Sequence, residues 1–316
     1  MRNDPTKSRE PKEQAEEACP HCRVEMIHAG ELHCLPDEIL AEANKVGPML
    51  CYGRNRNAIL GYSGSLPVMR PESGLLRGSS METYLTLDVN QWHQICIMQE
   101  RSLHCGDLIG LEAFDAEQSA LFRMAVAPDS DAEVWEELTR TFYRRDLELE
   151  QVRNFGRIAS LTPETHQHQR GPSVDLTHSE LRCEPLSISN GFPVDFEMGF
   201  AGGEFLARAI FSEIVEERQN VVVSIAGAFG YLSVSMQPCC LEAIQRGWLF
   251  IGGEGRALRL NAQAVISYWI GYASLGDRDF SYLEALDCYG DLMFRLTSEN
   301  AQSYRYWQAL ARSTQL

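Results

Sequence analysis

The chain has 316 residues, of which 44% are hydrophobic and 23% charged, and its formal net charge is −16. This composition is that of a globular protein, and the negative charge argues against duplex nucleic acid or anionic lipid as a partner, because both attract basic surfaces. No apolar run is long enough to insert into a membrane. Residues 1–17 lack the apolar core of a secretory signal, so the ten cysteines predict reduced thiols in the cytoplasm.

The N-terminal stretch divides into a tail and a cysteine motif. Residues 1–18 are rich in Glu, Lys and Pro, which predicts disorder. Cys19 and Cys22 follow with CxxC spacing, and Cys34 comes next. Thiolates at such positions bind zinc in other proteins, so Cys19, Cys22 and Cys34 are a candidate zinc site. The alternative is free surface thiols, because the neighbouring His33 and Cys34 do not easily face one metal.

The next part of the chain predicts a helix, a set of short strands and a second helix. Residues 36–46 have one apolar helical face, and residues 131–151 form an amphipathic pattern with Ser130 or Asp131 as its cap. Turn-forming residues separate the strand-length segments, and their spacing is too short for helical crossovers, which favours antiparallel pairing. The predicted strands are 48–53, 57–62, 81–89, 93–99, 108–115 and 119–126.

Residues 156–200 break this pattern and contain several prolines, which predicts a long connector. A helix over 203–218 and a closing helix over 300–312 then bracket a second set of strands. These predicted strands are 220–226, 229–236, 247–251, 256–260, 264–273, 280–287 and 291–297. The glycine-rich stretch 252–255 lies between two of them and is expected to be a hairpin turn.

The two sets of elements are copies of one unit. The segment LEAFDA at 111–116 returns as LEALDC at 283–288, and the same offset of 172 brings Trp135 onto Trp307. We therefore predict an α+β fold made by tandem duplication of a helix–antiparallel sheet–helix unit. The expected divisions are a tail at 1–18, a first repeat at 19–155, a connector at 156–200 and a second repeat at 201–316.

With these residues placed, the chain resembles the HemS/ChuS family of cytoplasmic haem-handling proteins, which are also tandem duplications. The LEAFDA segment, the segment GRNRNA at 53–58 and the segment SLTPETHQ at 160–167 carry the resemblance. The single-repeat ChuX/HutX proteins resemble the first half about as well. Two segments depart from the family pattern: QRGP at 169–172 follows the Thr-His segment, and GYA at 271–273 stands where a basic segment is expected.

The resemblance implies a haem site. It makes His166 the expected ligand of the haem iron, with His168 as the substitute, because residues two apart on an extended chain point to the same side. Arg54 is expected near the other haem face or a propionate, since guanidinium suits carboxylates. The competing interpretations are a solvated loop histidine and a turn arginine. Arg123 and Arg295 occupy matching positions and are expected to form structural ion pairs, while Trp135 and Trp307 are expected to anchor the core.

The resemblance implies a cytosolic haem-binding protein in haem and iron utilisation, acting in haem transfer or in haem breakdown after uptake. Its expected partners are haem, components of a haem importer or a downstream haem-degrading enzyme, and its expected state is a monomer or homodimer. The alternative is a diverged binding or regulatory module that keeps the duplicated fold without haem, with zinc near its N-terminus. If the protein is an enzyme, oxidative haem degradation is the expected reaction, although the sequence shows no separate set of catalytic residues.

Overall fold

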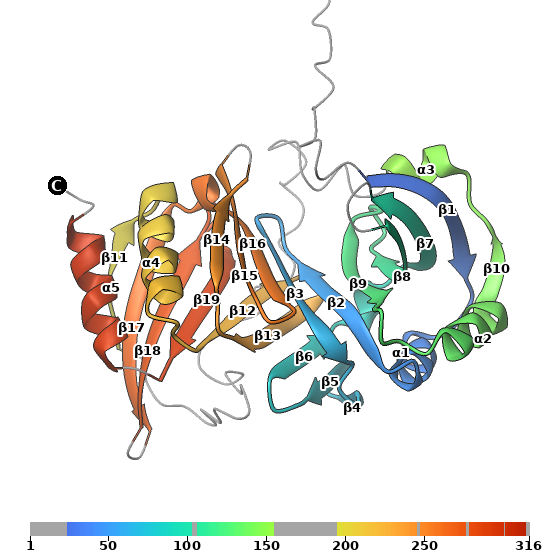
Figure 1. The fold of residues 1–316 in the computed structure, drawn as a ribbon, viewed down its shortest axis with the longest axis horizontal. Coiled ribbons are helices and arrows are strands. Elements are labelled where there is room, and N and C mark those ends of the chain that lie inside the picture. The colour runs from blue at the N-terminus through green and yellow to red at the C-terminus, as the bar shows by residue number, and fades with distance from the viewer. Residues whose placement is uncertain are drawn as a thin grey trace, which may run out of the picture.

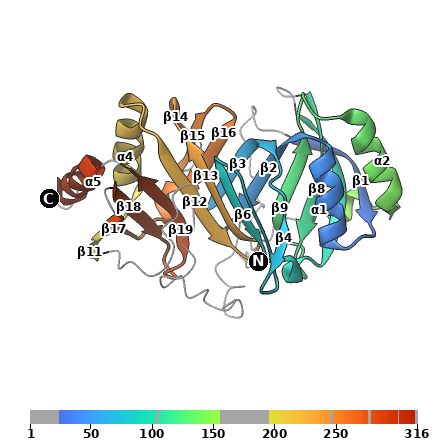
Figure 2. The ribbon, with the colours of Figure 1, turned by 90° about the horizontal axis from the view of Figure 1, so that it is seen from below.

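The computed structural model describes residues 24–102, 106–154, 195–244, 247–275, 278–299 and 301–313. These residues form two antiparallel sheets with helices at both ends of the molecule (Figure 1). Figure 2 shows α1 and α2 beside each other at one end and α4 and α5 at the other. None of the helices in these ranges is long and apolar enough to cross a membrane.

The elements of the two repeats follow the same order up to the closing helix, α2 or α5, after which the first repeat adds β10 and α3. The first repeat contains β1 (Val24–Leu32), α1 (Pro36–Lys45), β2 (Pro48–Arg54), β3 (Ala58–Ser65), β4 (Arg70–Glu72), β5 (Leu75–Ser79), β6 (Thr83–Leu87), the 3-10 turn η2 (Val89–Gln91), β7 (Gln94–Ser102), β8 (Gly106–Phe114), β9 (Ala120–Val126), α2 (Ala132–Phe142), β10 (Tyr143–Asp146) and α3 (Leu149–Asn154). The second contains β11 (Asp195–Ala201), α4 (Glu204–Glu216), β12 (Val221–Gly227), β13 (Gly230–Met236), β14 (Cys240–Ala243), β15 (Trp248–Gly253), β16 (Arg256–Asn261), the 3-10 turn η6 (Ala262–Ala264), β17 (Ser267–Leu275), β18 (Arg278–Leu286), β19 (Leu292–Ser298) and α5 (Ala301–Ser313).

The predicted offset of 172 is present in the structure. Strands β8 and β9 begin at Gly106 and Ala120, and β18 and β19 begin at Arg278 and Leu292. All strand pairs described are antiparallel, as in the central pair of β8 and β9. The predicted fold class, a duplicated α+β unit with antiparallel sheets, is therefore confirmed.

The two repeats exchange strands. One sheet has the order β10-β1-β7-β8-β9-β2-β3-β16-β15-β14, so its last three strands come from the second repeat. The other has the order β11-β17-β18-β19-β12-β13-β6-β5-β4, so its last three come from the first repeat. Leu258 of β16 pairs with Leu60 of β3, and Leu85 of β6 pairs with Leu232 of β13. Figure 1 shows these hairpins lying against the opposite repeat, which makes each sheet a product of both repeats.

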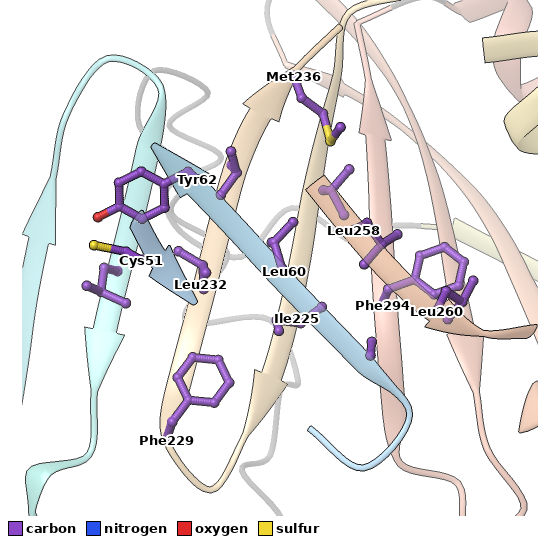
Figure 3. Close-up of a cluster of buried hydrophobic side chains, with 14 of the residues drawn as sticks. Cys51, Leu60, Tyr62, Ile225, Phe229, Leu232, Met236, Leu258, Leu260 and Phe294 are labelled. Atoms are coloured by element: carbon purple, nitrogen blue, oxygen red, sulfur yellow. The ribbon is translucent and has the colours of Figure 1, made fainter. Parts of the chain in front are cut away.

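The exchange joins the two repeats through one core. Leu60, Leu232 and Leu258 are fully buried between the sheets, together with Ile225 and Phe229 (Figure 3). The two predicted anchors, Trp135 and Trp307, are also buried, with 5% and 0% of their surface exposed. Separating the repeats would expose this shared apolar surface to water, so the pair folds as one body.

The predicted helix over 131–151 is wrong beyond its first half. Helix α2 ends at Phe142, residues Tyr143–Asp146 form β10, and a separate short helix α3 follows. Strand β10 pairs with β1, with Gly30 opposite Asp146. This pairing satisfies backbone groups along β1, and such tertiary pairing overrides the weak local preference for a helix.

The N-terminal cap of α2 was predicted correctly. The Asp131 carboxylate accepts hydrogen bonds from the backbone N–H groups of Glu133 and Val134, at 3.0 and 3.1 Å. The Ser130 hydroxyl instead donates to the carbonyl of Pro48, at 2.5 Å. The predicted hairpin at 252–255 is also present, because β15 and β16 pair across it with Glu254 and Gly255 at positive φ.

Six strands were not predicted, namely β1, β4, β5, β10, β11 and β14. Strand β11 begins at Asp195, inside the stretch assigned to the connector, and pairs with β17. The division of the chain at residues 18, 155 and 200 stays a proposal.

Candidate functional site

The outer face of the sheet that contains β2 is the candidate site. A Cβ atom on Gly53 would lie 2.7 Å from the ring of Phe229, so this position faces the shared core. Side chains alternate along a strand, so its neighbours Tyr52 and Arg54 point to the opposite, outer face. Both are half-buried.

An ion-pair cluster lies next to Tyr52 on this face. Arg123 of β9 stands between Tyr52 of β2 and Glu112 of β8 in the pairing register. The Arg123 guanidinium binds the Glu100 carboxylate of β7 at 2.5 Å. Burial raises the pKa of Glu112, and the positive charge of Arg123 opposes this rise. This cluster satisfies Arg123 within the sheet, which confirms its predicted structural role.

The second repeat contains the matching pair. Arg295 of β19 lies opposite Glu284 of β18, and its Nε donates to the Glu284 carboxylate at 2.6 Å. The Arg295 side chain is almost completely buried. Both arginines predicted to be structural are therefore held by a carboxylate of their own sheet.

Arg54 differs from Arg123 because it has no hydrogen bond or ion pair to any residue in the described part of the chain. Its positive charge nevertheless acts on two nearby carboxyl groups. Burial raises the pKa values of Glu112 and Asp115, and the Arg54 charge lowers them in part. The guanidinium therefore lies near the ion-pair cluster, and no described residue accepts a hydrogen bond from its donors.

A patch of small residues extends from Tyr52 across the exchanged strands. Gly61 of β3, Ala257 of β16 and Gly252 of β15 are successive partners in the register. A Cβ atom on Gly61 would lie 2.5 Å from the Tyr52 ring, and one on Gly252 would lie 2.8 Å from the Phe250 ring. The two aromatic rings thus cover the glycines on either side of Ala257, which gives this face an apolar, aromatic surface.

The equivalent face of the second sheet is filled. Ser224 and Ser233 occupy the positions of Tyr52 and Gly61, and their hydroxyl groups are hydrogen-bonded at 2.8 Å. Tyr282 occupies the position of Gly110 and is 1% exposed. Ala226 stands in place of Arg54. Of the two duplicated faces, the one around Arg54 is therefore the candidate for binding a ligand.

The remaining predicted ligands divide between described and undescribed segments. His166, His168, Cys19 and Cys22 lie outside the described residues. Cys34 is half-buried against the core, and burial together with the charge of Glu38 raises the pKa of its thiol to about 11. A raised thiol pKa disfavours the thiolate that binds zinc. The described ranges contain no group of three His, Cys, Asp or Glu residues placed to hold a metal.

The described histidines serve other elements of the fold. The Nε2 atom of His28 lies 2.8 Å from the Asp146 carboxylate, which links β1 to β10. His33 follows β1 and His93 precedes β7. No histidine occurs on β2, β3 or β16, so the described strands around Arg54 offer no imidazole to a metal.

The segment 53–58, which carries part of the family resemblance, also links the repeats. The Asn55 amide donates to the carbonyls of Ala226 and Met293, at 3.0 and 2.9 Å. The buried Asn57 amide donates to the Asp287 carboxylate at 3.2 Å. Sequence reasoning missed this role because the partners lie in the other repeat.

Arg56 belongs to the same contact. Its guanidinium carbon lies 4.4 Å from the ring centroid of Tyr289, a cation–π geometry. Residues from the β2–β3 turn therefore meet the β18–β19 turn, while Arg54 is left on the outer face.

Comparisons with known proteins agree with this architecture. Residues 14–142 match the family model of the haemin-degrading HemS.ChuX domain, and the match ends at the last residue of α2. No curated sequence matches the chain. ChuS of Escherichia coli O157:H7, described as a haem-degrading enzyme, is 16% identical with a TM-score of 0.64, and the alignment covers 89% of this chain and 86% of ChuS. Holo-PhuS of Pseudomonas aeruginosa, described as a haem-binding protein, is 18% identical with a TM-score of 0.64 and coverage of 91% and 87%.

A second structure of the E. coli protein, described as a haem oxygenase, is 17% identical with a TM-score of 0.63, and covers 90% of this chain and 89% of ChuS. At these identities the structural matches establish the fold, and the family model identifies the domain within the first repeat. The resemblance seen in the sequence is confirmed: residues 14–142 match the HemS/ChuX domain model, and the chain as a whole has the fold of ChuS and PhuS.

Proposed function

We propose that this protein binds haem in the cytoplasm and acts in haem utilisation, by intracellular transfer or breakdown of haem after uptake. His166 is the axial ligand of the iron, with His168 as the substitute, and Arg54 contacts the other haem face or a propionate. The observation that carries this proposal is the state of Arg54. Its side chain is half-buried on the outer face and has no hydrogen bond or ion pair to a residue in the described ranges. The HemS/ChuX domain and the haem-related proteins that share the fold support it.

The described residues fit part of what haem requires. Haem needs an apolar surface for its ring, positive charge for its propionates and an axial ligand. The outer face offers Tyr52, Ile59 and Phe250 as apolar and aromatic surface, and Arg54 as a cation. The axial ligand must come from elsewhere, because β2, β3 and β16 carry no histidine. The segment that contains His166 and His168 is the source that the family resemblance implies.

The protein's own contribution is binding and orientation. Bound haem would supply the iron chemistry for oxidative breakdown. The Arg123 cluster would hold the sheet beside the ligand, and the aromatic rings of Tyr52 and Phe250 would cover part of its apolar surface. Arg54 neutralises negative charge without becoming part of the reacting group.

Titration of the purified protein with haemin tests the proposal. Wild type should show a saturable Soret band, and His166→Ala should shift or abolish it without loss of the fold. Arg54→Ala should weaken binding less, because it removes one charge-assisted contact and leaves the iron bond. His33→Ala is the matched control and should bind as wild type does. Affinity should fall as the pH drops through the titration range of histidine, since only neutral imidazole binds iron.

The result that refutes the ligand assignment is an unchanged spectrum in both His166→Ala and the His166→Ala, His168→Ala double variant. A wild-type protein without any saturable band would refute haem binding. The second candidate, a diverged module without haem, would then stand. One observation favours that candidate: β17 carries Gly271 and Ala273 where the family resemblance predicts basic residues.

A further inference from the structure

We propose that Arg259, which the second repeat contributes, forms with Arg54 a two-cation clamp for a planar ligand that has two carboxylates on one edge. The inference rests on the proposed haem-binding function and deepens it, because it names the residues that receive the propionates. It also assigns a role in the site to the exchanged strand β16, which arises from the distant part of the chain.

The register places the two arginines on one row of the sheet. Arg54 of β2 and Arg259 of β16 are both direct partners of Ile59 on β3. Direct partners in antiparallel strands point to the same face, so both guanidinium groups lie on the outer face with Ile59 between them. Two strand spacings separate their backbones by roughly 10 Å, and long flexible side chains can adjust that separation to a pair of carboxylates.

Both cations are available. Arg54 is half-buried and Arg259 is exposed, and neither has a hydrogen bond or an ion pair to a residue in the described ranges. By contrast, Arg256 on the same strand is held by Glu82. Arginine forks bind carboxylates through paired donors, which makes two free guanidinium groups on one row suited to a dicarboxylate.

The acidic groups nearby oppose the clamp only weakly. Glu112 lies opposite Arg123 in the register, and the Asp115 carboxylate accepts hydrogen bonds from the backbone N–H groups of Glu117 and Ser119, so both groups have partners of their own. Glu242 lies two strands beyond Arg259, with Phe250 between them in the register. An exposed charge at that separation is largely screened by salt.

The row beside the clamp supplies a surface for a ring. Tyr52, Gly61, Ala257 and Gly252 form the adjacent cross-strand row, two residues along each strand from the arginine row. A flat apolar ring placed on these residues would direct substituents on one edge toward Arg54 and Arg259. The combination of an apolar surface, made by Ala257 and the rings of Tyr52 and Phe250, with two cations at one edge matches a porphyrin with two propionates.

The duplicated fold provides an internal comparison. In the other sheet the equivalents of Arg54, Ile59 and Arg259 are Ala226, Tyr231 and Thr86, and the next residue of that row is Arg77, which forms an ion pair with Glu72. The positions of both clamp arginines are therefore uncharged in the other sheet, and the arginine that its row does contain is held by a carboxylate. A need to hold the sheet together does not explain the arginine pair, because the second sheet forms the same pairing without it.

Binding of iron-free protoporphyrin IX tests the clamp separately from iron ligation. Arg259→Gln should weaken protoporphyrin IX and haemin by a similar factor of about five- to tenfold, as expected for one exposed charge-assisted contact. Arg259→Lys should retain part of the affinity. Arg140→Gln removes an exposed arginine on α2 and serves as the control for net charge, with no expected change. The dimethyl ester of protoporphyrin IX lacks both carboxylates, so wild type should bind it weakly. Its affinity for wild type should equal that of the free acid for the Arg54→Gln, Arg259→Gln double variant.

Two results would overturn the clamp: Arg259→Gln that binds protoporphyrin IX like the control, or a dimethyl ester that binds wild type as tightly as the free acid. A lost Soret response in His166→Ala alone, with Arg259 variants unaffected, refutes the clamp and leaves the proposed function intact. The reverse pattern, Arg259-dependent protoporphyrin binding without iron ligation by His166, supports the clamp and refutes the ligand assignment. If wild type binds no porphyrin, both proposals fail.

Discussion

Replacing Asn55 by alanine should destabilise the whole protein, because this side chain joins the two repeats. Its Oδ1 accepts hydrogen bonds from the backbone N–H groups of Asn57 and Ala58, at 3.0 and 2.8 Å. Its Nδ2 lies 3.0 Å from the carbonyl of Ala226, 2.9 Å from that of Met293 and 3.3 Å from that of Leu292. The amide therefore fixes its own turn and both neighbouring strands of the other repeat.

The magnitude follows from the number of partners that alanine would leave without a hydrogen bond. Each intramolecular hydrogen bond contributes about 0.5–1.5 kcal/mol, and each buried group left unsatisfied costs about 1–3 kcal/mol. Asn55 is only partly buried, so water replaces some of these bonds. We expect a loss of about 3–4 kcal/mol, a large share of the roughly 5–15 kcal/mol that stabilises a folded domain.

Urea denaturation followed by circular dichroism measures this free energy of unfolding. Asn90→Ala is the matched control, because the Asn90 amide also donates to a backbone carbonyl, that of Gly74 at 3.0 Å, but is exposed. The control should lose no more than about 0.5–1 kcal/mol. Asn55→Asp should be at least as harmful as alanine, because a carboxylate keeps the acceptor and places charge against three carbonyls. Equal midpoints for Asn55→Ala and Asn90→Ala would refute the assigned role of Asn55.

Three further predictions concern titratable and metal-binding groups. The hydrogen bond to Asp146 raises the pKa of Tyr143 to about 12. The stability that this bond contributes should be fully present below the ordinary phenol pKa and lost as the pH rises through about 12. Carbon-13 NMR of labelled tyrosine should show a lower Tyr143 pKa in Asp146→Asn, and an unchanged pKa would contradict the bond. Burial raises the pKa of Glu112, so the stability associated with its neutral form is present at acidic pH and lost as the pH rises. Glu112→Gln should therefore have a larger free energy of unfolding than wild type at neutral pH, and the two values should converge in acid. A difference in unfolding free energy that does not change with pH would contradict this prediction. Elemental analysis checks the predicted zinc site: about one equivalent of metal, lost in Cys34→Ser, supports it, and metal-free protein with reactive thiols removes it.

The sequence allowed the duplication and most strands to be predicted, because these depend on local patterns. The offset that aligns Trp135 with Trp307 survives in the structure, and both residues are buried. Strand β1 was missed because a β-bulge between Met26 and His28 breaks the alternation of apolar and polar residues that predicts a strand. It is stabilised by partners on both sides, β7 and β10. The predicted helix over 131–151 was too long because β10, which replaces its second half, depends on a partner strand more than 100 residues away.

The strand exchange was beyond local reasoning. A hairpin such as β15–β16 has the same pattern of apolar residues whether it pairs with its own repeat or with the other. The choice between these pairings is made by the shared core, which no short window of sequence contains. The candidate site shares this difficulty, because Arg54 was found through the family resemblance but its neighbours Phe250 and Arg259 arrive from the second repeat.

Exchange also explains how the repeats can differ in chemistry while they keep one fold. Each outer face is built from strands of both repeats, so a substitution on an exchanged strand changes the face mainly associated with the other repeat. Arg259 belongs to the second repeat but serves the face of Arg54, whereas Thr86 belongs to the first repeat and lies on the filled face with Ala226. The second repeat can thus have the uncharged Ala226 in place of Arg54 on its own sheet and still supply a cation to the face of Arg54. A ligand site of this kind requires both copies, which gives a physical reason for a two-repeat chain to retain the second copy.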